Sequence, residues 1–152
     1  MESERATMHL LRDVTRTFAR VQRQAFSCCG PASETQCLLL TGLAPGEALP
    51  VSQIATRLGS DVAWVSRTVE QLSRSGDLER RADLSDRRVA LVQLTHTGED
   101  RARQLQDALD RQAEAILDAI PEERRATVLE ALHLLRGALG AVEERTVTSS
   151  DG

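Results

Sequence analysis

The feature that most constrains the fold is the segment 51–72, where apolar and small residues repeat at helical spacing on both sides of one glycine. The apolar positions that can face one small core are Ile54, Leu58, Val62, Val65, Val69 and Leu72. Ala55 is small where a second helix has to cross closely, and Gly59 stands where a tight turn favours a left-handed backbone. A plain helical hairpin does not need these residue types together at these offsets. The segment therefore predicts two helices, at 51–58 and 62–75, joined by a tight turn.

Directly after this unit the apolar pattern changes to strand spacing. Residues 78–82 and 89–94 are predicted to form two strands around a polar tip at 83–88. Four arginines bracket that tip: Arg80, Arg81, Arg87 and Arg88. All 19 basic residues of the chain are arginine, whose planar fork contacts phosphates and base edges, although a GC-rich genome explains the same bias. Two such helices followed by such a hairpin form a winged helix-turn-helix, so residues 51–95 are the predicted DNA-binding unit.

Further helices are predicted on both sides of this unit. The first covers residues 6–27 and has one apolar stripe of Met8, Leu11, Val14, Phe18, Val21 and Ala25. A capping box that begins at Ser33 opens a second helix, which we expect to end near Ala44. A long helix is expected from residue 96 to about residue 119, and a final one after Pro121. The stripe of that last helix is Val128, Leu132, Leu135, Leu139 and Val142, a spacing that suits packing along a partner helix.

These elements divide the chain into four parts. Residues 1–50 are predicted to form a dimerisation helix and a connecting helix, residues 51–95 the DNA-binding unit, residues 96–146 the C-terminal dimerisation helices, and residues 147–152 a disordered tail. With two Phe, one Trp and no Tyr, the core has to be built from aliphatic residues, which suits packed helices. The predicted fold is mainly α with a small β-wing (α+β), a winged helix-turn-helix with N- and C-terminal dimerisation helices.

The net charge of −4 argues at first against binding to nucleic acid, but the charges are unevenly distributed. Residues 51–95 carry seven arginines against six acids, whereas residues 96–150 carry seven against eleven. A local basic edge on an acidic protein is therefore expected. No apolar run approaches the roughly 18 residues of a membrane span, and no signal segment opens the chain. We accordingly expect a cytoplasmic protein with no membrane partner.

The second helix of the unit is expected to place its N-terminal half in the major groove of double-stranded DNA. The candidate contacts there are Ser60, Trp64, Ser66 and Arg67. Arg67 is the strongest candidate because its guanidinium can pair with guanine edges, the alternative being an ordinary solvated charge. Trp64 has two equal interpretations, a contact with DNA or packing under the wing.

Three stretches of the sequence resemble the MarR family of bacterial regulators: Gln53-Ile-Ala-x-Arg-Leu58, Val65-Ser-Arg-x-Val-x-x-Leu72 and Asp86-Arg-Arg-x-x-Leu-Val-x-Leu-Thr-x-x-Gly98. The resemblance covers nearly the whole chain. It implies that Asp86 helps to fix the wing tip and that Arg87 inserts into or beside the minor groove, with Arg88 as the adjacent candidate. It places Ser66 and Arg67 on the recognition helix.

The resemblance also implies a homodimer formed by the first, fifth and sixth helices. Its two-fold axis would make the protein read a pseudo-palindromic operator, with repression as the expected mode of action. The residues favour the same conclusion independently, because the terminal helices carry more apolar surface than a small winged unit can cover.

The only cysteines, Cys28, Cys29 and Cys37, fall within ten residues of one another. Three interpretations stay open: buried thiols acting as small apolar groups, thiolates that bind a soft metal or metalloid ion, and a redox switch. Cys37 is predicted near the first turn of a helix, where the helix N-terminus lowers the pKa of a thiol. A zinc finger is not predicted, because there is no paired C-x-x-C and the histidines lie far off in sequence. No other cofactor is expected.

Two other classes of function were weighed against a regulator. We do not expect an enzyme, because the sequence has no phosphate-cradling glycine loop, no H-E-x-x-H and no supported Ser/His/Asp set. A winged-fold module that binds only protein would suit the negative net charge, but it gives no reason for the arginines around the wing tip. If the cysteines are merely buried, the effector of the regulator is instead a small aromatic or drug-like ligand.

Overall fold

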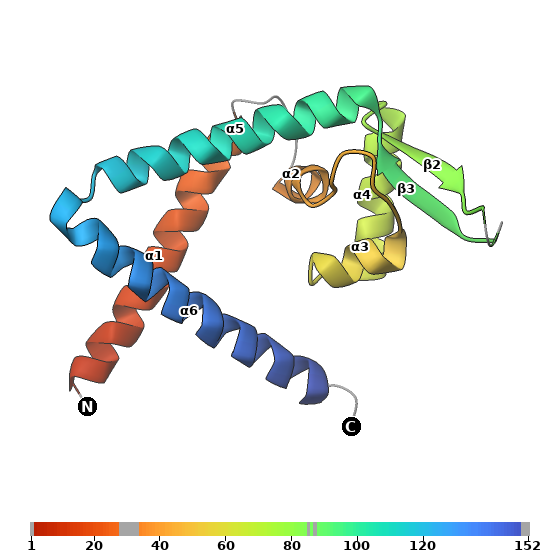
Figure 1. Cartoon of the computed structure of the whole chain (residues 1–152). Coiled ribbons are helices and arrows are strands. Elements are labelled where there is room, and N and C mark those ends of the chain that lie inside the picture. The colour runs from red at the N-terminus through yellow and green to blue at the C-terminus, as the bar shows by residue number, and fades with distance from the viewer. Residues whose placement is uncertain (1, 28–33, 85, 87, 150–152) are drawn as a thin grey trace. The chain divides into compact units, whose positions relative to one another are not determined.

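The computed structural model describes the backbone of residues 2–27, 34–84, 86 and 88–149, and the side chains of 3–26, 34–84, 86 and 88–142 (Figure 1). Its elements are α1 (Glu2–Ser27), α2 (Glu34–Thr41), β1 (Ala48–Pro50), α3 (Val51–Arg57), α4 (Val62–Arg74), β2 (Leu78–Ala82), β3 (Ala90–Leu94), α5 (His96–Asp118) and α6 (Glu122–Ser149). The chain divides into two compact units, Met1–Gln112 and Ala113–Gly152. In the described part of the chain, no helix is both long and apolar enough to cross a membrane.

The turn between α3 and α4 has the predicted left-handed glycine. Gly59 has a φ of +58°, and the Ser60 amide donates to the carbonyl of Ala55 at 2.9 Å. Asp61 caps α4, since its Oδ1 accepts the amide of Trp64 at 3.0 Å. Val62 departs from the prediction: it is half exposed, because the first residue of α4 lies beyond the edge of the core.

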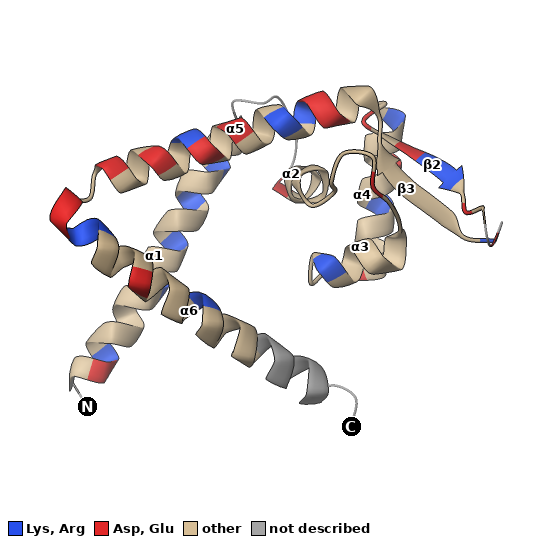
Figure 2. Cartoon of the chain, viewed as in Figure 1, with Lys and Arg blue, Asp and Glu red and all other residues tan. Residues whose placement is uncertain are grey.

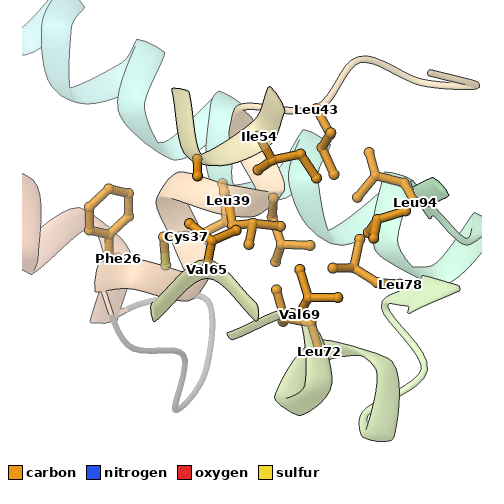
Figure 3. Close-up of a cluster of buried hydrophobic side chains, with 14 residues drawn as sticks. Phe26, Cys37, Leu39, Leu43, Ile54, Val65, Val69, Leu72, Leu78 and Leu94 are labelled. Atoms are coloured by element: carbon orange, nitrogen blue, oxygen red, sulfur yellow. The ribbon is translucent and has the colours of Figure 1, made fainter. Parts of the chain in front are cut away.

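The core of the first unit lies between α2, α3, α4, the sheet and α5 (Figure 3). Its buried members are Phe26, Cys37, Leu39, Leu40, Leu43, Ile54, Ala55, Val65, Val69, Leu72, Leu78, Val92, Leu94 and Leu105. Phe26 brings the end of α1 into this cluster, and Leu105 brings in α5. The cluster is almost entirely aliphatic, as the scarcity of aromatic residues predicted.

The sheet is antiparallel, with the strand order β1-β3-β2. The hairpin of β2 and β3 was predicted, but β1 was not, because its three residues end at a proline and look like a loop. Leu49 pairs with Val92 in the register of β1 and β3. A proline at the end of an edge strand costs no ladder hydrogen bond, so Pro50 is compatible with this strand. The fold is therefore mainly helical with a small winged sheet, which confirms the predicted fold class.

Two predicted helix ends were displaced. α2 ends at Thr41 rather than near Ala44, and the proposed cap Ser33 lies outside the described residues. α6 continues to Ser149, past residue 146 where the polar composition had suggested the beginning of a disordered tail. Within the second unit, Arg125 closes the turn before α6: its guanidinium donates to the carbonyl of Ile120 at 3.2 Å and to Asp118 at 3.3 Å.

Candidate nucleic-acid interface

α4 has one buried and one exposed side. The buried residues are Val65, Thr68, Val69 and Leu72. The exposed side carries Ala63, Arg67, Glu70 and Arg74 at steps of three and four residues, which places them on one face of the helix. The core thus anchors the inner side, and the outer side is open to a groove of a nucleic acid.

The two arginines on this face differ in their surroundings. Arg67 is exposed. Arg74 lies 3.7 Å from Glu70, but both side chains are well exposed, so this pair contributes little to stability and leaves Arg74 available to a phosphate. Arg74 was not among the predicted contacts. The signal that could have found it is its position seven residues after Arg67, on the same helical face.

The other predicted contacts of this helix are less exposed than Arg67. Ser60 is half buried in the turn, and its hydroxyl donates to the carbonyl of Leu58 at 3.1 Å. Ser66 is also half buried. Trp64 is half buried and packs against the core cluster, which favours packing for much of its ring. Arg67 is therefore the most accessible of the four.

Backbone hydrogen bonds shape the tip of the wing. The Asp83 amide donates to the carbonyl of Val89 at 3.0 Å, and the Val89 amide donates to the carbonyl of Asp86 at 2.9 Å. The Asp86 carboxylate accepts the amide of Arg88 at 3.0 Å, a contact that restrains the backbone beside the tip. Arg88 is exposed. Arg87, the arginine for which the resemblance implies a minor-groove contact, lies outside the described residues.

The register of the wing places Arg80 and Arg81 on opposite faces of the sheet. Arg81 lies on the outer face, where it donates to Gln93 at 3.1 Å while Gln93 donates to Glu79. Arg80 pairs with the buried Val92 and so shares the face of the sheet that covers the core, although its own side chain is exposed. Figure 2 shows basic residues on β2 and on α4. Sequence reasoning treated these two arginines as one cluster, because their separation depends on the strand register.

Arg57, on the neighbouring helix α3, is engaged within the protein. Its guanidinium lies 2.7 Å and 2.9 Å from the two carboxylate oxygens of Glu47 and donates to the carbonyl of Gly42 at 3.1 Å. The bond from Arg57, followed by the amide of Ala44, lowers the pKa of Glu47 from 4.5 to about 2. This pair connects α3 to the loop before β1, so Arg57 is a structural residue rather than a reader of nucleic acid.

Of the three cysteines, Cys37 is the one among the described residues. Cys37 is 0% exposed and belongs to the core cluster, as the buried interpretation predicted for it. Cys28 and Cys29 lie outside the described residues. Among the residues that are described, no group of three His, Cys, Asp or Glu side chains is placed to hold a metal ion. A reactive thiolate at Cys37 would need access to solvent that the folded chain does not provide.

A cavity of about 230 Å³ opens between α2, the following loop, the end of β3 and α5. Its apolar wall is formed by residues that include Leu40, Leu43, Leu94 and Ala102, and Arg103 and Glu99 stand among its polar residues. A mostly apolar hollow with a few polar groups is the usual form of a small-molecule site.

Comparison with known proteins assigns the winged unit to a family. Residues 32–90 match the sequence model of the MarR family. Residues 32–90 are a MarR-family domain. The resemblance seen in the sequence is thereby confirmed for residues 32–90. Over 118 residues the chain is 27% identical to YdgJ of Bacillus subtilis, an uncharacterised HTH-type transcriptional regulator, covering 78% of this chain and 72% of that protein.

Solved structures of two bacterial proteins share the fold. Streptococcus pneumoniae FabT in complex with DNA superposes with a TM-score of 0.77 at 22% identity, covering 89% of this chain and 98% of that one. Bordetella bronchiseptica BpsR, whose DNA binding is regulated by 6-hydroxynicotinic acid, superposes with a TM-score of 0.67 at 20% identity, covering 84% and 91%. At these identities the likeness establishes the shared fold alone.

Proposed function

We propose that this MarR-family protein is a homodimeric transcriptional repressor that binds a pseudo-palindromic operator in double-stranded DNA. The observation that carries this proposal is the position of Arg67. It stands on the exposed side of α4, while the opposite side of that helix is anchored in the core. Such a rigid helix can present one guanidinium to base edges in the major groove, where a bidentate contact distinguishes guanine.

The remaining contacts divide by the part of DNA that they would meet. Ser60, Trp64 and Ser66 are proposed to border the groove around Arg67. Arg74, Arg80 and Arg88 are proposed phosphate contacts, because all three are exposed and stand on α4 or the wing. Asp86 is proposed to orient the wing tip so that Arg87 reaches the minor groove.

Apolar side chains exposed in the single chain support the dimer. On α1 they are Met8, Leu10, Leu11, Val14 and Phe18, and on α6 they are Leu129, Leu132, Leu134, Leu139 and Val142. Proteins rarely leave so many large apolar side chains of one helix in contact with water, so a partner surface is expected to cover them. A second copy of the chain would supply matching helices and would set two reading units at a defined spacing.

The proposal is tested by selecting binding sites from random duplex DNA with the full-length protein and measuring affinity by fluorescence anisotropy. We expect Arg67→Ala to lower affinity about tenfold or more and to relax the preference at one base position. Arg74→Ala should weaken binding to all sequences and reduce the salt dependence by about one phosphate contact. The matched control is Arg103→Ala on α5, an exposed arginine that is not among the proposed DNA contacts. If the wild-type protein enriches no sequence, or if binding is insensitive to salt, the assignment as a DNA-binding regulator is wrong.

The cavity between α2 and α5 favours a small organic molecule as the effector. A cavity of about 150 Å³ is known to hold benzene, so about 230 Å³ accommodates a single substituted ring. Arg103 at its edge could pair with an acidic substituent. We expect single-ring aromatic acids to release DNA and Ala102→Phe, which fills the cavity, to prevent the release while DNA binding persists. Equal release from both proteins would exclude this site.

Thiol sensing by a soft metal, a metalloid or an oxidant is a second proposal for the effector. It rests on the adjacent Cys28 and Cys29, since Cys37 is buried. Arsenite, a mercury compound or peroxide should then release DNA from the wild type but not from the triple Cys→Ser variant. Identical release from both proteins would reject thiol sensing.

A further inference from the structure

A buried carboxylate lies at the turn between α4 and β2. Asp77 is 2% exposed, and its Oδ2 accepts a hydrogen bond from the hydroxyl of Ser75 at 2.6 Å. The same oxygen lies 2.7 Å from Nη1 of Arg101, a residue of α5 whose side chain is 24% exposed. The reading of DNA proposed above uses neither residue, and an ionised group that is removed from water is costly unless it is paired this well.

The backbone around this pair joins the same two parts of the protein. The carbonyl of Asp77 accepts the amide of Thr95 at 3.0 Å, and the hydroxyl of Thr95 donates to the carbonyl of Gly76 at 2.6 Å. That hydroxyl also accepts the amide of Gly98 at 3.0 Å and so caps the first turn of α5. These hydrogen bonds thus join the turn between α4 and β2 to the start of α5.

A buried ion pair of this kind fixes the relative orientation of the groups that it joins more than it adds to stability. Replacing a buried pair by apolar residues is often neutral for stability, whereas the fixed geometry of its hydrogen bonds selects one arrangement of the groups that it joins. The carboxylate of Asp77 accepts a hydrogen bond from Ser75, the residue that follows the end of α4. Its partner Arg101 lies one turn inside α5. The pair therefore restrains the angle between α5 and the unit formed by α4 and the wing.

We propose that Asp77 and Arg101 are positioning residues that set the spacing between the two DNA half-sites the dimer accepts. This inference rests on the proposed function, in which α5 belongs to the dimerisation helices. If the angle between α5 and α4 is fixed, the two recognition helices of the dimer stand at one separation. If the pair is broken, that separation varies, and DNA with altered spacing is tolerated better.

The experiment uses the full-length protein and the site that the wild type selects from random duplex DNA. Affinity is measured for this site and for versions with one base pair added or removed between the half-sites. Arg101→Met and Asp77→Asn are compared with Asp100→Asn, which removes an exposed pair with Arg103 on the same helix. Circular dichroism and sedimentation establish that each variant is folded and dimeric, and Arg101→Met alone suffices if Asp77→Asn does not fold.

In Arg101→Met and Asp77→Asn we expect the preference for the correct spacing to fall about threefold or more. Asp100→Asn should keep the wild-type preference, and Arg101→Lys, which restores a cation, should regain part of it. A variant that is merely destabilised would lose affinity equally for all spacings. Such an equal loss, or an unchanged preference in Arg101→Met, would overturn the positioning role. Failure of the wild type to select any site would instead refute the proposed function.

Discussion

Gly98 lies in the first turn of α5 with its Cα against the backbone of Asp77. A Cβ at this position would lie 1.9 Å from the carbonyl oxygen of Asp77 and 2.9 Å from its carbonyl carbon. That is about 1.5 Å short of an ordinary van der Waals contact. The obstacle is backbone rather than the end of a flexible side chain, so Gly98→Ala requires α5 or the α4–β2 turn to move.

The size of the destabilisation follows from the contacts that this movement breaks. The movement would break the bond from the Thr95 amide to the carbonyl of Asp77, at 3.0 Å, and the bond from the Gly98 amide to the Thr95 hydroxyl, also at 3.0 Å. Losing both costs about 2 kcal/mol. Overpacking adds about 2 kcal/mol. The higher helix propensity of alanine returns about 1 kcal/mol. We therefore expect Gly98→Ala to lower the free energy of unfolding by about 3 kcal/mol.

Urea denaturation followed by circular dichroism measures this change, at one fixed protein concentration because a dimer's stability depends on it. The matched control is Gly137→Ala on α6, where a Cβ meets none of the described residues within 4 Å and where alanine should be neutral or stabilising. Gly98→Ala with the stability of the wild type would refute the reasoning, since it would show that the turn and α5 are not in tight contact.

Three further predictions concern the core, the pH dependence and the dimer. Leu39→Ala should destabilise the protein by about 3 kcal/mol, whereas Leu38→Ala, at a neighbouring residue that is 47% exposed, should cost less than about 1 kcal/mol; equal losses in urea denaturation would contradict the core assignment. The folded pKa of Glu47, about 2, is below its ordinary value, so its contribution to stability is complete above pH 4.5 and disappears as the pH falls towards 2. Glu47→Gln should therefore be less stable than the wild type at pH 7 and converge with it near pH 2, and a constant difference at all pH values would exclude this titration. Leu132→Arg should yield monomers in sedimentation experiments, and an unchanged dimer would show that this part of α6 is not at the interface.

A last prediction addresses the buried thiol. In a Cys28→Ser/Cys29→Ser variant the remaining thiol belongs to Cys37, which is 0% exposed. A thiol reagent should modify it only when the protein unfolds, because burial denies the reagent access to the sulfur. Modification in native buffer at the rate of a small model thiol would show that Cys37 is accessible and would reopen its role in sensing.

Much of the architecture could be predicted because its signals are local. The positions of Ile54 and Leu72 follow from the 3.6-residue period of a helix, and the left-handed backbone at Gly59 follows from the chemistry of one residue. The position of Arg67 on the outer side of α4 was predicted from the same helical period. The strand β1 could not be found, because a three-residue strand exists only where β3 offers it a hydrogen-bonding edge.

The sequence by itself determined the helical periods, the glycine turn and the presence of a basic hairpin, since each depends on residues a few positions apart. Only the tertiary structure decided which face of the wing each arginine occupies, that Cys37 is enclosed, and that Asp77 is paired with Arg101. These three outcomes depend on contacts between residues far apart in the chain. The register of β2 against β3 and the approach of α5 to the α4–β2 turn result from packing the whole core, so no local pattern could specify them.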